Sequence, residues 1–121
     1  MRRAMVLSSL LLAVAALGQA AEQTYGVKLE LGVMVPMRDG VRLSTDVYRP
    51  DAPGKFPVVL QRSAYDNGSA GYVKRGRFYA SHGFVCVVQD VRGRGDSEGE
   101  FYPLRHEAED GYDAQTWCGT Q

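Results

Sequence analysis

Residues 57–90, PVVLQRSAYDNGSAGYVKRGRFYASHGFVCVVQD, carry the pattern that decides the fold class. Two short apolar runs, residues 57–60 and 84–88, are rich in valine, which is typical of strands buried on both faces of a parallel sheet. Between them, small and apolar residues recur at helical spacing up to Gly83, a residue type that commonly ends a helix. The stretch therefore predicts a β-α-β unit in which the two strands run parallel.

An antiparallel β-hairpin is predicted before this unit. Apolar residues occupy every second position from Val27 to Val35, which indicates a half-buried strand. A second alternation covers residues 41–47, and this strand is predicted to end at Pro50. The turn between them contains Asp39-Gly40, a pair that favours the positive backbone angles of a hairpin turn.

A loop and a second helix are predicted after Asp90. The loop is the glycine-rich segment 91–99, and the helix runs from about Arg105 to Cys118. On that helix one stripe is small or apolar and the other side is acidic. The stripe is Ala108, Gly111, Ala114 and Cys118, and Glu109, Asp110 and Asp113 lie opposite. The complete order, a hairpin followed by β-α-β-α, is an α/β sheet that is interrupted part-way.

The first twenty residues have the pattern of a secretory signal peptide. Arg2 and Arg3 precede an apolar run over residues 5–17, and small residues end the segment at Ala20. The run is shorter than the roughly 20 apolar residues of a transmembrane helix. We therefore expect cleavage after Ala20, a mature chain of residues 21–121 without stable membrane insertion, and a secreted or periplasmic location.

Composition excludes several functional classes. Hydrophobic residues make up 45% of the chain and charged residues 23%, which is ordinary for a soluble domain. Fourteen Lys and Arg residues balance fourteen Asp and Glu residues, so no excess of positive charge favours nucleic acid. With two histidines and no cluster of ligands, no metal site is predicted. Cys86 and Cys118 could form a disulfide or remain free thiols.

The glycine-rich loop contains three short motifs that could mislead. Residues 93–99 resemble a dinucleotide-binding pattern, but the third glycine is one residue late and no helix is predicted there. Ser97 could be a nucleophile in a Gly-Asp-Ser block, but we interpret it as a loop hydroxyl that binds nearby backbone groups. Arg94-Gly95-Asp96 spells an integrin-recognition tripeptide, which supports an alternative function, a non-catalytic secreted interaction module.

Three other polar residues receive structural interpretations. Asn67 begins a formal N-glycosylation acceptor, Asn-Gly-Ser. His82 lies at the predicted end of the first helix, where it can bind the last carbonyl groups. His106 lies among acidic residues near the start of the second helix, and neither histidine has a Ser or Cys partner in the pattern of a catalytic triad.

Five blocks of sequence, in the correct order, resemble the X-Pro dipeptidyl-peptidase/cocaine esterase family. The blocks are residues 35–43 (VPMRDGVRL), 46–50 (DVYRP), 63–66 (SAYD), 88–101 (VQDVRGRGDSEGEF) and 107–113 (EAEDGYD). The resemblance covers about residues 33–117. It implies the N-terminal part of an α/β-hydrolase fold and an exported serine hydrolase that forms an acyl-enzyme from a small ester or peptide substrate. No cofactor or metal is implied, and ester and peptide substrates are not distinguished.

The same resemblance implies a role for Tyr65. In that family a tyrosine in the loop after the third strand donates its hydroxyl group to the oxyanion of the tetrahedral intermediate. Tyr65 stands in the corresponding loop; the alternative is that its ring only tethers the loop. The family order Ser…Asp/Glu…His places the whole triad, and the nucleophile elbow, after Gln121. We therefore expect this chain alone to be inactive, contributing the oxyanion-hole side only; an inactive truncated gene product is a further alternative, and the oligomeric state is left open.

Overall fold

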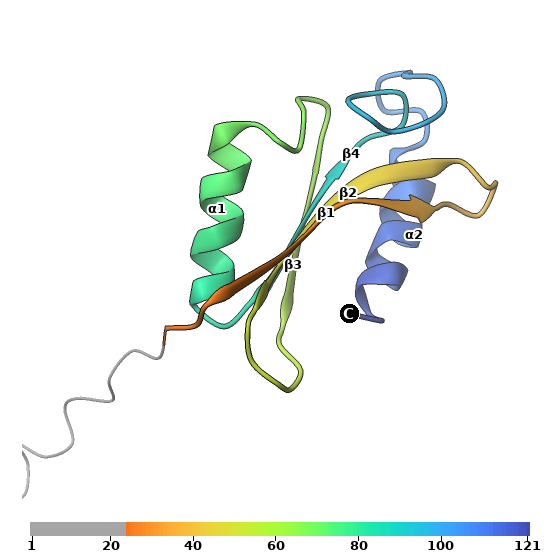
Figure 1. The fold of residues 1–121 in the computed structure, drawn as a ribbon. Coiled ribbons are helices and arrows are strands. Elements are labelled where there is room, and N and C mark those ends of the chain that lie inside the picture. The colour runs from red at the N-terminus through yellow and green to blue at the C-terminus, as the bar shows by residue number, and fades with distance from the viewer. Residues whose placement is uncertain (1–23) are drawn as a thin grey trace, which may run out of the picture.

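Six secondary-structure elements follow the predicted hairpin and β-α-β-α order (Figure 1). The computed structural model describes residues 24–121, so the predicted signal peptide lies outside the described residues. The elements are β1 (Val27–Pro36), β2 (Arg42–Pro50), β3 (Val58–Ser63), α1 (Ala70–Ser81), β4 (Val85–Asp90) and α2 (Glu107–Cys118). Among residues 24–121, none of the helices has the length and apolar character needed to span a membrane.

The four strands form one mixed sheet in the order β1-β2-β4-β3. β2 pairs antiparallel with both β1 and β4, whereas β3 and β4 are parallel, as the β-α-β pattern predicts. Every residue of β4 is buried, which confirms that prediction for the second apolar run. The same prediction is wrong for β3, whose residues are only partly buried up to Ser63. In the described sheet β3 is an edge strand with a neighbour on one side only.

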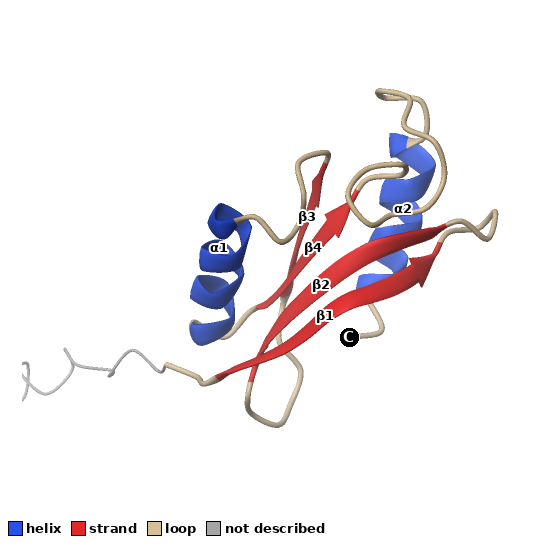
Figure 2. Ribbon diagram, turned by 45° about the horizontal axis from the view of Figure 1, so that its top comes forward, coloured by secondary structure: helices blue, strands red, loops and turns tan. Residues whose placement is uncertain are grey.

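The two helices cover opposite faces of the sheet (Figures 1 and 2). On one face, α1 contributes Ala80 to a core with Tyr48 and Cys86. On the other face, the end of α2 contributes Cys118 to a core with Val47 and other apolar side chains. The two cysteines are therefore separated by the sheet, and both are free and buried. Burial raises the pKa of both thiols, that of Cys118 to about 11, so neither forms a thiolate readily at neutral pH.

The first strand departs from the simple alternation that its sequence predicts. A β-bulge between Glu30 and Val33 shifts the register, and Leu31 is 61% exposed. As a result, Val27 and Leu29 pack on the α1 side, whereas Val33 joins the core on the α2 side. The backbone N–H of Gly32, which has a φ of 67°, donates to Asp46 Oδ1 at 2.8 Å. The apolar residues before and after the bulge therefore both occupy every second position, although they point to opposite faces of the sheet. The sequence pattern alone does not reveal this change of face.

Both helices end much as predicted, and α2 begins later than predicted. Gly83, with a φ of 87°, follows the C-cap residue of α1, and His82 Nδ1 lies 2.7 Å from the carbonyl oxygen of Phe78. The predicted structural role of His82 is therefore consistent with its contact. The second helix begins at Glu107 because the preceding residue, His106, has a φ of −112° and a ψ of 2°, outside the values of an α-helix.

Candidate active site

The loops that follow β3 and β4 meet at the carboxyl end of these parallel strands. Ligands of open α/β sheets bind in the crevice outside this end. Residues 64–69 connect β3 to α1, and residues 91–106 connect β4 to α2. Tyr65 is the second residue after β3, and 76% of its side chain surface is exposed. The structure therefore places the residue singled out by the sequence at the end of the sheet where a site is expected.

Backbone contacts, and not the ring of Tyr65, hold this loop in place. The N–H of Tyr65 donates to Ser63 Oγ at 2.9 Å, and Ser63 Oγ donates to the Tyr72 hydroxyl at 2.8 Å. The carbonyl oxygen of Ala64 accepts from Arg94 Nε at 3.1 Å. No hydrogen bond joins the Tyr65 hydroxyl to another residue within 24–121. The ring is thus presented to solvent by a backbone that is fixed on both sides.

A buried carboxylate, Asp90, ends β4 directly beneath this loop. Asp90 is 1% exposed, and its Oδ1 accepts the backbone N–H of Asn67 at 2.7 Å. Its Oδ2 is buried without a hydrogen-bond partner among the described residues. Loss of water around the carboxylate raises the pKa of Asp90 above its ordinary value. Asn67 is itself 5% exposed and its Nδ2 donates to the carbonyl oxygen of Ser44, so it is not accessible as a glycosylation acceptor in this fold.

The glycine-rich loop packs against Asp90 and serves as a support. Ser97 Oγ donates to the carbonyl oxygen of Asp90 and accepts the N–H of Ser44, both at 2.8 Å. The interpretation of Ser97 as a loop hydroxyl is therefore confirmed. A Cβ atom at Gly95, which has a φ of 52°, would overlap the Asp90 carboxylate. This glycine is needed because the backbone passes so close to a buried side chain.

The competing motifs of this loop find little support. No helix begins between residues 93 and 99, since α2 starts at Glu107, so a pyrophosphate would meet no helix N-terminus there. The tripeptide Arg94-Gly95-Asp96 is exposed, but its guanidinium is engaged. Arg94 donates to the Ala64 carbonyl oxygen and lies 4.8 Å from the centre of the Phe101 ring.

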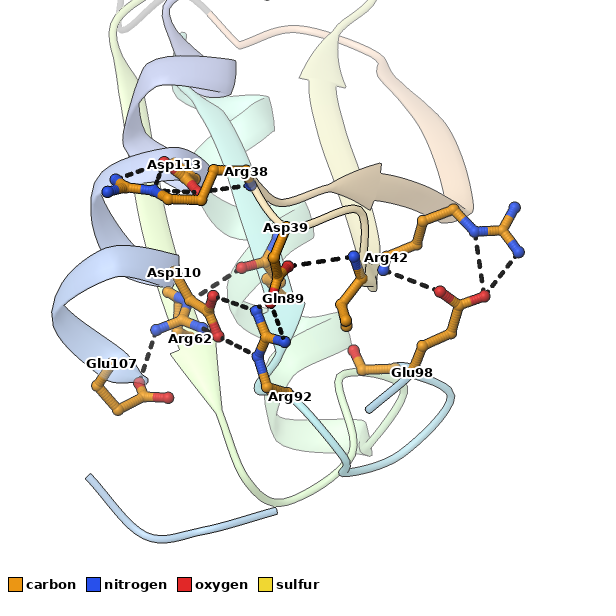
Figure 3. A network of polar contacts seen from close by, with 12 residues as sticks. Arg38, Asp39, Arg42, Arg62, Gln89, Arg92, Glu98, Glu107, Asp110 and Asp113 are labelled. Carbon is orange, nitrogen blue, oxygen red and sulfur yellow. Dashed lines mark hydrogen bonds and ion pairs between the residues drawn. The ribbon is translucent and has the colours of Figure 1, made fainter. Parts of the chain in front are cut away.

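A network of charged side chains joins the hairpin turn, the loop after β4 and α2 (Figure 3). Arg92, only 8% exposed, donates from Nε and Nη2 to Asp110 at 2.9 and 2.7 Å. It also donates from Nη1 to Asp39 at 2.8 Å, and this contact is the main cause that lowers the pKa of Asp39. The prediction that Asp110 lies opposite the stripe of Ala114 and Cys118 is wrong, because these three are the buried residues of α2 and Asp110 is 2% exposed. Its burial is possible because a bidentate arginine faces it.

The network extends to β3 through Arg62. Arg62 donates to Glu107 Oε2 at 2.6 Å and to Gln89 Oε1 at 3.0 Å. Gln89, in the middle strand, then donates to Thr45 Oγ1 at 3.0 Å. Reasoning from the sequence missed this network because its members lie in β2, β3, β4, α2 and two connecting loops and match no local motif. One local signal was present in the sequence. Asp110 lies four residues before Ala114, on the same face of α2, so helical spacing places this acidic side chain on the buried face.

Among the hollows lined by residues 24–121, two border β3, and one of these two lies beside the Tyr65 loop. It has a volume of about 260 Å³ and is lined by Ala64, Val91 and Phe101, among others. The other, of about 420 Å³, lies between β3 and α2, with Leu60 and Cys118 in its lining. Only the first touches the loops at the carboxyl end of the strands, so it is the hollow relevant to a ligand. Among residues 24–121 no cluster of metal-binding side chains is present.

Comparison with known proteins identifies the class and then the family. The fold matches the N-terminal part of hydrolase structures of the CocE/NonD type. An α-amino acid ester hydrolase is 30% identical with a TM-score of 0.66, over 85% of this chain and 20% of that chain. A CocE/NonD family hydrolase from Staphylococcus aureus is 29% identical with a TM-score of 0.66, over 77% of this chain and 20% of that chain. This chain therefore has the N-terminal part of an α/β-hydrolase fold.

The family follows from the sequence comparisons. Residues 39–121 match the model of the family described as X-Pro dipeptidyl-peptidase (S15 family). The cocaine esterase of Rhodococcus sp. (strain MB1 Bresler) is 43% identical over 93 residues, which are 70% of this chain. The chain belongs to the X-Pro dipeptidyl-peptidase (S15) family. It spans 16% of the length of that esterase, so the activity of a whole protein is a matter for proposal.

Proposed function

We propose that the complete protein containing this chain is a serine hydrolase that cleaves an ester or a peptide bond through an acyl-enzyme. Membership of the S15 family supports the reaction class. The names of the relatives support both substrate types, since one is a cocaine esterase and another structure is of an aminopeptidase. In this proposal the Ser, the His and the acid come from outside this chain, in the order that the α/β-hydrolase fold uses.

Within the proposal, this chain supplies one half of the oxyanion hole. The observation that carries it is Tyr65, exposed at the carboxyl end of β3 on a backbone held by Ser63 and Arg94. Its hydroxyl group donates a hydrogen bond to the oxyanion as the nucleophile attacks the carbonyl carbon. The second donor is the backbone N–H of the residue after the nucleophile. A donor that is fixed before the reaction stabilises the developing charge without reorganisation at that moment.

Replacing Tyr65 by phenylalanine in the complete protein tests this role. Phenylalanine keeps the ring and removes only the O–H, so KM should change little. Loss of one oxyanion donor should lower kcat on the order of 10²–10³-fold. Tyr112→Phe is the matched control, because Tyr112 is also exposed (66%) but lies on α2. A fall in kcat of less than about threefold for Tyr65→Phe would show that Tyr65 is not a donor.

The substrate class and the export of the protein need separate measurements. Parallel assays with a p-nitrophenyl ester and an X-Pro p-nitroanilide distinguish an esterase from a dipeptidyl-peptidase. Turnover of neither by a folded protein would favour the interaction-module alternative. We further propose export, supported by the basic and apolar pattern before Ala20. Mass spectrometry of the mature protein should find Ala21 as the N-terminal residue, and a retained Met1 would contradict export by this route.

A further inference from the structure

A backbone amide next to Tyr65 is held by a buried carboxylate that the proposed reaction does not use. Asp90 Oδ1 accepts the N–H of Asn67, two residues after Tyr65, at 2.7 Å. We propose that Asp90 is a positioning residue, which fixes the direction of the Tyr65 hydroxyl through Asn67. This inference rests on the proposed function of Tyr65 as an oxyanion donor.

The burial of the Asp90 carboxylate without a cation lowers the stability of the folded protein. Within residues 24–121 no Lys, Arg or His forms an ion pair with it, although its side chain is buried. A buried carboxylate without a cation is unfavourable compared with an apolar side chain of similar volume. The neighbours nevertheless accommodate it: Gly95 leaves room for Oδ2, and Asn67 supplies an N–H. The arrangement therefore favours a role in geometry over a role in stability.

Two backbone contacts flank the turn that carries Tyr65. Asp66, between Tyr65 and Asn67, has a φ of 54°, a conformation that Asp adopts more readily than most residues, and its Oδ1 accepts the Gly68 N–H at 2.9 Å. The N–H of Tyr65 is fixed by Ser63 on one side, and the N–H of Asn67 is fixed by Asp90 on the other. If Asp90 loses its acceptor, Asn67 is held only through its side chain, which donates to the Ser44 carbonyl oxygen, and the turn of Asp66, Gly68 and Ser69 can shift as a unit with the Tyr65 ring. A displacement of about 1 Å at such a donor can cost on the order of 100-fold in rate.

A double-mutant cycle on the complete enzyme tests the inference. Asp90→Ala should lower kcat about 10–100-fold with a smaller change in KM. In a Tyr65→Phe background, where no hydroxyl remains to be positioned, the same change should lower kcat by less than about threefold. Asp90→Asn keeps an acceptor for the Asn67 N–H and should restore kcat to within about threefold of the parent.

The matched control is Asp46→Ala. Asp46 is also buried in the sheet and also accepts one backbone N–H, that of Gly32 in the β1 bulge, a contact that involves no residue of the Tyr65 loop. It should lower the melting temperature without changing kcat. Should Asp90→Ala fail to fold, Asp90→Val preserves most of the volume and equally lacks an acceptor.

The outcomes separate this inference from the proposed function. If Tyr65→Phe alone leaves kcat unchanged, the proposed function fails. If Tyr65→Phe lowers kcat but the effects of the two substitutions multiply, Asp90 acts elsewhere and the inference is overturned. A folded Asp90→Ala or Asp90→Val enzyme with parental kcat would overturn it too, as would an Asp90→Asn enzyme as slow as Asp90→Ala.

Discussion

Two buried aspartates of this fold have opposite surroundings. Asp110, on α2, is 2% exposed and faces Arg92 through two hydrogen bonds, with Arg62 Nη2 at 4.0 Å (Figure 3). Asp90, at the end of β4, is 1% exposed and accepts one backbone N–H, that of Asn67, with no ion pair to a cation within residues 24–121. The first arrangement joins a helix and a hairpin turn to the sheet. The second holds a loop that carries a candidate functional residue.

The comparison distinguishes a buried carboxylate that stabilises the fold from one that positions a loop. An ion pair that joins separate elements fails when one partner is removed, because the other charge is left buried. A carboxylate that accepts loop N–H groups can be replaced with smaller loss of stability, while the loop changes position. Changes at Asp110 should therefore appear in unfolding, and changes at Asp90 in turnover.

The largest stability effect is expected at Asp110. Asp110→Ala in the complete protein leaves Arg92 buried and only partly paired through Asp39, and should lower the free energy of unfolding by about 3–5 kcal/mol. Replacing both partners, Arg92→Met with Asp110→Leu, should recover most of that loss, since two apolar side chains fill the space without charge. Urea unfolding measures both. If the Asp110→Ala protein is as stable as the parent, the Arg92–Asp110 pair does not stabilise the packing of α2.

A smaller, pH-dependent effect is expected at Asp90. Burial raises its pKa in the folded protein, so the folded state binds a proton more tightly than the unfolded chain does. Stability from this group is therefore present at low pH and is lost as pH rises from the ordinary aspartate pKa through the raised one. Asp90→Asn cannot ionise and escapes this loss.

Relative to the parent, the Asp90→Asn protein should gain stability as pH rises above the ordinary aspartate pKa of about 4, on the scale of 1 kcal/mol, typical of one buried polar group. Melting temperatures of both proteins across this range provide the measurement. A constant difference at all pH values would mean that Asp90 titrates as it does in the unfolded chain.

Much of the fold could be predicted from local patterns. Valine-rich runs predicted β3 and β4, helical spacing up to Gly83 predicted α1, and the Asp39-Gly40 pair predicted the turn. The bulge in β1 could not be predicted, because the apolar period of two continues through Gly32 while the strand changes face. The partial burial of β3 depends on its place at the edge of the sheet, which its own residues do not record.

The candidate site was predictable only in part. The resemblance to a family located Tyr65, but no local pattern reports that its loop is held by Asp90, because that contact joins residues 23 positions apart. The face of Asp110 follows from helical spacing, since Asp110, Ala114 and Cys118 lie four residues apart on α2, whereas its partner Arg92, 18 positions away in a loop, could not be predicted. Partners distant in sequence decide which polar residues a fold can bury.

The smallest effect is expected at Glu98, an exposed carboxylate that completes the comparison. Arg42 Nη2 lies 2.6 Å from Glu98 Oε1, with the two side chains 56% and 41% exposed. The hydrogen bond from Arg42 lowers the pKa of Glu98, so any stability from the pair is present above the ordinary glutamate pKa and is lost as pH falls. Water and salt screen an exposed pair, so Arg42→Met should shift the melting temperature by no more than about 1–2 °C, and less at 1 M salt. Thermal melting at about pH 7 and about pH 3, in low and high salt, is the measurement. If Arg42→Met lowers stability as much as Asp110→Ala does, the exposure of a carboxylate does not determine how strongly its ion pair stabilises this fold.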